Sequence, residues 1–139
     1  NRFDIVRLAG KVLGTNLYIG AGFHGSIAGL KAAQHELWLT TEKNGQKQFF
    51  FIHSGRGAVG GRDNSGLGMI MRYDPAKKKW ETLTSGARIL FNLCRDAEWG
   101  IPLVLLGSFE RLTVKYSVMS GPPGHEVRNS DTTGELMLR

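Results

Sequence analysis

Residues 36–53, ELWLTTEKNGQKQFFFIH, decide the fold, because two apolar segments there flank the dipeptide Asn44-Gly45. Asn-Gly tolerates the two positive φ angles of a type I′ turn and therefore predicts a β-hairpin with a two-residue loop. A loop of that length also fixes which residues face each other across the hairpin. We expect these pairs on one face: Glu36 with His53, Trp38 with Phe51, Thr40 with Phe49, and Glu42 with Lys47.

The opposite face of this hairpin would carry Leu37, Leu39, Phe50 and Ile52, so both faces are largely apolar. Strands that are apolar on both faces belong in the interior of a sheet that is covered on both sides. We therefore place the hairpin in the middle of a curved sheet or a barrel.

The rest of the chain adds short strands and two candidate helices. Apolar segments bounded by Gly, Pro, Asn and Asp predict strands at residues 3–8, 11–19, 69–74, 79–84, 101–107 and 112–119. Residues 26–35 predict a short helix, and residues 85–98, SGARILFNLCRDAE, predict a longer one, capped by Ser85, with apolar residues at helical spacing. The expected fold class is mainly β (α+β), a curved sheet or β-barrel-like structure with one or two packed helices.

The chain of 139 residues is long enough for one domain with a real core, so we expect a single domain over 1–139, standing alone or within a longer protein. Its only cysteine, Cys94, excludes an internal disulfide framework and fits a reducing compartment. No signal peptide and no apolar run of membrane-spanning length is visible. We therefore expect a cytoplasmic protein that does not enter a membrane.

The net charge of +6 is concentrated in one part of the chain. Clustered cations favour a polyanion such as nucleic acid, since binding phosphates releases counterions. A solvated, solubilising surface explains the same charges without a partner. Residues 43–79 contain two acidic residues, Asp63 and Asp74. The same segment contains eight basic residues: Lys43, Lys47, Arg56, Arg62, Arg72, Lys77, Lys78 and Lys79.

A glycine-rich loop, residues 54–68, follows the hairpin and carries Arg56 and Arg62. Glycine lets a ligand approach the main chain closely, so we expect binding at this loop. Its pattern matches neither a P-loop nor a dinucleotide fingerprint, and no histidine or cysteine pair has metal-ligand spacing. We therefore expect no cofactor and no metal ion.

An aromatic slot is the second candidate feature, because Trp38, Phe49 and Phe51 would share a face with Glu36 and His53. Aromatic rings beside a carboxylate can hold a flat base, which stacks on the rings and donates an exocyclic amine to the acid. Ordinary core packing explains the same rings without a ligand. Cys94, on the apolar side of the predicted helix, is interpreted as a core residue rather than a nucleophile.

Several segments together resemble the SET- and RING-associated (SRA or YDG) domain family. GFHGS at 22–26, FFFIHSG at 49–55 and GGRDNSG at 60–66 are similar to its motifs in order and spacing, and ILFNLC at 89–94 and IPLVLLG at 101–107 are similar to its later helix and strand. The resemblance implies a β-barrel-like module that flips a modified cytosine, usually 5-methylcytosine, out of double-stranded DNA. In bacteria such modules commonly target modification-dependent restriction nucleases.

The resemblance also implies roles for individual residues. His53 matches the tyrosine that stacks on the flipped base, and Ser54 matches the threonine beside it. Gly22 and Gly25 match the backbone that lines the pocket. The DNA backbone would be contacted by the basic residues Lys43, Lys47, Arg56, Arg62 and Arg72.

Two family features have no counterpart in this chain. Residues 67–69 stand where eukaryotic members carry an Asn-Lys-Arg finger, and residues 40–42 stand where the family has the aspartate that reads the cytosine amine. Glu36 or Glu42 would replace that acid, and Trp38 would supply the missing aromatic ring.

Enzymatic alternatives remain open. His24-Gly25-Ser26 is similar to the HG[ST] segment of ADP-ribosyltransferases, although the next strand follows sooner than in that family. A small basic, toxin-like ribonuclease that uses His53 or His24 would also agree with the charge and size. A pure interaction domain is a further alternative. For this domain alone we expect a binding module rather than an enzyme.

Overall fold

The computed structural model describes residues 4–24, 33–54, 65–83, 88–93, 96–120, 129–132 and 136–138. It consists of antiparallel strands and one short 3-10 turn. In chain order these are β1 (Asp4–Leu13), β2 (Asn16–His24), β3 (Gln34–Lys43), β4 (Gln46–His53), β5 (Ser65–Asp74), β6 (Lys79–Thr82), β7 (Ile89–Leu93), β8 (Asp96–Pro102), η1 (Leu103–Leu105), β9 (Arg111–Ser120), β10 (Asn129–Thr132) and β11 (Leu136–Leu138).

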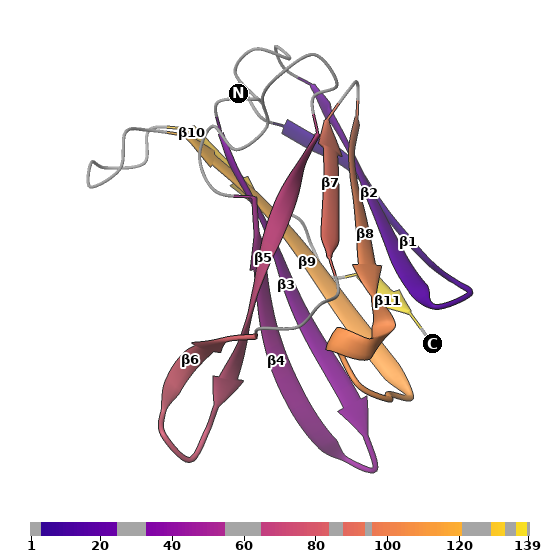
Figure 1. Ribbon diagram of the computed structural model, residues 1–139. Helices are drawn as coiled ribbons and strands as arrows, with labels where there is room; N and C mark the ends of the chain where they lie inside the picture. Colours follow the sequence, from indigo (N-terminus) through magenta and orange to yellow (C-terminus); the bar gives the residue numbers. More distant parts are fainter. Residues whose placement is uncertain are drawn as a thin grey trace.

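The strands form two sheets that share β5 (Figure 1). Sheet A runs β1-β2-β8-β7-β5, and sheet B runs β5-β4-β3-β9, with β6 beside β5 and with β10 and β11 beside β9. The first half of β5 pairs with β7, whereas its second half pairs with β4 and β6. Strand β5 therefore connects the two sheets, which fold toward each other at this strand. At the other edge of sheet A, β1 contacts β10 and β11 of sheet B. The mainly β, curved-sheet prediction is confirmed, and the described strands do not form a closed barrel.

The core lies between the two sheets. One face of each strand supplies it, because side chains alternate along a strand. From sheet B it takes Leu37, Leu39, Phe50 and Ile52, and from sheet A it takes Phe91, Trp99 and Ile101, all at most 1% exposed.

The predicted hairpin is confirmed in every pair. β3 and β4 pair Glu36 with His53, Trp38 with Phe51, Thr40 with Phe49, and Glu42 with Lys47. Asn44 and Gly45 have φ angles of 51° and 75°, as a type I′ turn requires. The hairpin lies inside sheet B, flanked by β9 and β5. Only one of its faces is core, however, and the face with Trp38 and Phe49 is open to solvent.

The predicted helix at 85–98 is wrong, because its described residues lie in β7 and β8. Ile89, Phe91 and Leu93 are buried and alternate with exposed neighbours, which is the period of a strand. The helical interpretation placed Leu90 in the core, yet this side chain is 58% exposed. Cys94 lies outside the described residues.

Other boundaries differ from the prediction. The break predicted near residues 9 and 10 occurs instead at Gly14, whose φ of 62° suits the turn between β1 and β2. The strand predicted at 101–107 ends at Pro102 and gives way to the 3-10 turn. The short helix predicted at 26–35 falls largely outside the described residues, and its last residues, from Gln34, belong to β3. The strands predicted at 69–74 and 79–84 fall in β5 and β6, which pair with each other as an antiparallel hairpin.

Candidate functional site

The outer face of sheet B, which points away from the core, carries a continuous set of aromatic side chains. Strand pairing places Lys115 beside Trp38, Trp38 beside Phe51, and Phe51 beside Met71. One step along the strands, Tyr73 pairs with Trp80. We call this surface the aromatic face; its rings are those of Trp38, Phe49, Phe51, His53, Tyr73 and Trp80.

Five of the rings of the aromatic face contact one another, and three of the six rings are exposed. Trp38 lies 4.5 Å from Phe51 and 6.1 Å from Trp80, measured between ring centroids. Phe51 stacks on His53 at 5.3 Å with an interplanar angle of 24°. Trp38, Phe49 and Trp80 are 40%, 44% and 38% exposed. Such a contiguous apolar patch on a soluble surface marks an interaction site.

The aromatic face is hollowed where its two indole rings approach. This aromatic hollow has a volume of about 310 Å³, at the lower end of the range for small-ligand sites. Trp38 and Trp80 meet there at an interplanar angle of 77°, so a flat group can lie against one ring and meet the edge of the other. The hollow is lined by Trp38, Leu39, Thr40, Phe49, Phe50, Tyr73 and Trp80.

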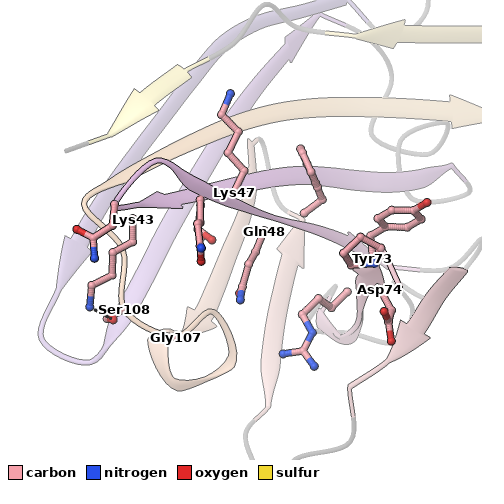
Figure 2. Close-up of a pocket in the computed structure, with 13 residues that line it drawn as sticks. Lys43, Lys47, Gln48, Tyr73, Asp74, Gly107 and Ser108 are labelled. Carbon is pink, nitrogen blue, oxygen red and sulfur yellow. Dashed lines mark hydrogen bonds between the residues drawn. The ribbon is translucent and has the colours of Figure 1, made fainter. Parts of the chain in front are cut away.

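A second, larger depression opens where β4 and β5 diverge. The ladder between these strands ends at Phe50 and Arg72, beyond which β5 continues with β6 (Figure 1). We call the gap the fork, and the polar depression of about 830 Å³ within it the cleft. Lys43, Gln46, Gln48, Arg72, Asp74 and Ser108 are among the residues that line the cleft. Figure 2 shows Lys47 and Tyr73 pointing to the opposite side of β4 and β5 from Gln48 and Asp74.

The predicted cations are therefore divided between two faces. Lys43 and Arg72 follow the parity of the core face and line the cleft. Lys47 follows the parity of the outer face, two residues from Phe49, and also borders the cleft. The Lys43 ammonium donates a hydrogen bond to Ser108 Oγ at 2.7 Å. Arg56 and Arg62 lie outside the described residues, and so does Gly25.

Glu36 and His53 are neighbours across the hairpin at the opposite end of the aromatic face from the fork. Glu36 is 5% exposed, and its carboxylate accepts a hydrogen bond from the Gln34 amide. The Nδ1 atom of His53 is buried and has no hydrogen-bond partner among the described residues. The pair therefore adjoins the other rings of the aromatic face, because the His53 ring stacks on the Phe51 ring.

Ser54 and Glu42 each make contacts within the fold. Ser54 Oγ accepts a hydrogen bond from the backbone N–H of His35, and the Ser54 N–H donates to the His35 carbonyl, so Ser54 holds the start of β3. Glu42 lies six residues from Glu36 along one strand, a separation of about 20 Å. It faces Arg111 at 3.8 Å. Of these two carboxylates, Glu36 is therefore the one close to His53.

Gly22 lies in sheet A, under the ion pair between Arg7 and Asp96. A Cβ at this position would come within 3.2 Å of Asp96 Oδ1 and 3.4 Å of Arg7. Its lack of a side chain is therefore explained by this local packing. His24, at the end of the same strand, is exposed.

Trp80 and Lys115 are part of the site, and the sequence analysis did not assign them to it. Alternation along β6 could have placed Trp80 on the outer face. Lys115 could be found only from the pairing of β9 with β3, which brings it next to Trp38 from far along the chain.

His35 lies in the core and belongs to a structural network. The buried Tyr116 hydroxyl accepts a hydrogen bond from Trp99 Nε1 at 3.3 Å and lies 2.6 Å from His35 Nδ1. Burial raises the pKa of Tyr116 well above its ordinary value, and the Trp99 hydrogen bond opposes that rise. His35 is fully buried and therefore closed to a substrate.

Comparison with protein-family models, with curated proteins and with solved structures finds no match. Within the described ranges, no cluster of His, Cys, Asp and Glu side chains could hold a metal ion. The same ranges contain no helix long and apolar enough to cross a membrane.

Proposed function

We propose that this domain binds nucleic acid by stacking an unpaired nucleobase in the aromatic hollow. One observation carries the proposal: Trp38 and Trp80 surround an open hollow on the surface instead of packing into the core. A nucleobase is a flat ring with two stacking faces, and each base stacked on an aromatic side chain contributes about 1–3 kcal/mol.

The charges beside the aromatic face favour a nucleic acid over other ligands that stack on rings. Lys115 is the cross-strand neighbour of Trp38, and Lys47 lies two residues from Phe49; both side chains are exposed. A neutral sugar or an apolar peptide would gain contact with the rings but nothing from these ammonium groups. A polynucleotide gains from both, because its phosphates follow the bases at short intervals.

We further propose that the base is a modified cytosine, with 5-methylcytosine as the first candidate, extruded from double-stranded DNA. The resemblance to SRA domains supports this step, and it makes the domain the targeting module of a modification-dependent restriction system. Extruding a base costs a few kcal/mol, which stacking on the indole rings and contacts to phosphates can offset. Glu36 is the cross-strand neighbour of His53, whose ring stacks on Phe51, and would be the carboxylate that meets the base.

The test is a binding panel of duplexes that carry plain, methylated, hydroxymethylated or glucosylated cytosine, together with a single strand of the same sequence. Trp80→Ala should weaken binding of every stacked ligand by about 1–3 kcal/mol. Tyr18→Ala is the matched control, because Tyr18 is also an exposed aromatic residue, at 46% against 38% for Trp80, but lies on sheet A.

Equal losses in the two variants would refute stacking in the hollow. Equal affinity for heparin and for every duplex would leave only a general attraction to polyanions. A single-strand preference would remove the extrusion step but keep the stacking.

A further inference from the structure

The cleft and the aromatic hollow meet at the fork. Both depressions are lined by Phe49 and Tyr73, although the first opens on the core side of sheet B and the second on its outer face. At this place β4 and β5 are no longer paired, because their ladder ends at Phe50 and Arg72. A ligand can therefore contact both faces of the sheet without a strand between its two parts.

The cleft has an excess of positive charge. Its one lining carboxylate, Asp74, accepts hydrogen bonds from the backbone N–H groups of Ala76 and Lys77 at 2.9 and 3.2 Å, so that charge is already engaged within its own turn. Glu81, the cross-strand partner of Arg72, binds the Lys77 ammonium at 3.0 Å. Among the described residues, Arg72 consequently has no carboxylate bound to its guanidinium.

The cations of the cleft suit a phosphate group. Lys43 uses one ammonium proton for Ser108 and keeps two for a ligand. Arg72 offers a planar fork of N–H donors, which matches the oxygen atoms of a phosphate. The side-chain amides of Gln46 and Gln48 line the same space and can donate to further oxygen atoms.

We infer that the minimal ligand of this domain is a single nucleotide, held through the fork with its base in the aromatic hollow and its phosphate between Lys43 and Arg72 in the cleft. The inference rests on the proposed function and adds the second half of the site. It covers a nucleotide within a strand, one at a strand end and a free nucleotide, because all three join a base to a phosphate through one sugar.

The test measures binding of deoxycytidine, its 5′-monophosphate, its 3′-monophosphate and inorganic phosphate to the full chain by calorimetry. One of the monophosphates should bind at least about tenfold more tightly than the nucleoside, the effect expected of a charge-assisted hydrogen bond. Arg72→Gln and Lys43→Gln should each remove most of that difference and leave nucleoside binding unchanged. Trp80→Ala should weaken nucleoside and nucleotide equally, and Lys11→Gln, an exposed lysine on sheet A, should change neither.

Equal affinity for nucleoside and nucleotides overturns the inference; if oligonucleotide binding still depends on Trp80, the proposed function survives that result. Nucleotide binding no tighter than that of inorganic phosphate overturns it as well, because the base then contributes nothing. Oligonucleotide binding that is indifferent to Trp80→Ala refutes the proposed function itself. Circular dichroism of each variant confirms that the fold is kept, and a pair of 5′-phosphorylated and unphosphorylated oligonucleotides separates a strand end from an internal position.

Discussion

Two clusters of aromatic rings differ in position: one lies in the core between the sheets, and the other lies on the outer face of sheet B. The inner cluster contains Phe91 and Trp99, whose ring centroids are 4.4 Å apart, and the outer cluster contains Trp38 and Phe51, at 4.5 Å. The ring contacts are alike, but Trp99 is 1% exposed and Trp38 is 40% exposed. In the inner cluster, the indole N–H of Trp99 also donates a hydrogen bond to the Tyr116 hydroxyl inside the core.

Contact between aromatic rings therefore does not by itself distinguish a core from a binding surface. The inner rings are covered by the opposite sheet, and their hydrogen-bonding groups have partners, so they contribute to stability. The outer rings contact one another, and Trp38 and Trp80 keep more than a third of their surface exposed. We expect substitutions inside to change the free energy of unfolding and substitutions outside to change binding.

The largest effect is expected from Trp99→Ala. Removing this fully buried indole leaves a cavity and should lower the free energy of unfolding by about 3–5 kcal/mol. Trp38→Ala removes a ring of similar size whose loss opens no cavity in the core, and it should cost far less. Urea unfolding of both variants checks the contrast, and equal losses of stability would abolish the distinction between the clusters.

Alkaline pH should weaken the inner cluster through Tyr116. Burial raises the pKa of Tyr116 in the folded state, whereas the unfolded chain releases this proton near pH 10. This difference in pKa contributes fully to the free energy of unfolding below pH 10. The contribution falls as the pH rises above 10, by up to about 1.4 kcal/mol per pH unit. Urea unfolding between pH 8 and pH 11 measures how the free energy of unfolding depends on pH. The decrease at alkaline pH should be smaller in Tyr116→Phe than in the unsubstituted protein and unchanged in Tyr18→Phe. Identical pH dependence in all three proteins would contradict this role of Tyr116.

Trp38→Ala should reduce affinity for a base-containing ligand by about 1–3 kcal/mol while the thermal unfolding curve moves little. The reason is that Trp38 lines the hollow from the outside of the sheet. Fluorescence anisotropy with a labelled duplex measures the affinity. Trp38→Phe keeps a stacking ring and should recover part of the loss, which a merely structural role would not predict.

The smallest effect is expected from Lys115→Gln. If this exposed lysine meets a phosphate, the plot of log affinity against log salt concentration should become shallower by about 0.9. Lys11→Gln on sheet A should leave the slope unchanged. A slope that is unaltered in both variants would remove Lys115 from the interface.

The sequence predicted the hairpin of β3 and β4 well, because Asn44-Gly45 is a local signal that sets both turn and register. It misassigned residues 89–93 and 96–98, where Ile89, Leu90 and Leu93 recur at helical spacing while Ile89, Phe91 and Leu93 alternate as in a strand. Only burial between two sheets, which is set by distant pairing, selects the strand. The site was partly predictable for the same reason: Trp38 and Phe51 follow from the register, whereas Lys115 and the fork depend on how β9 and β5 join the hairpin.

The chain has three tryptophans, two in the outer cluster and one in the inner cluster, which allows one direct test of the central claim. The measurement is a ¹H–¹⁵N correlation spectrum of the indole N–H groups during titration with a duplex that carries 5-methylcytosine. We predict that the Trp38 and Trp80 signals shift or broaden while the Trp99 signal stays in place. A complex that forms with Trp38 and Trp80 unchanged would contradict stacking on the outer face of sheet B.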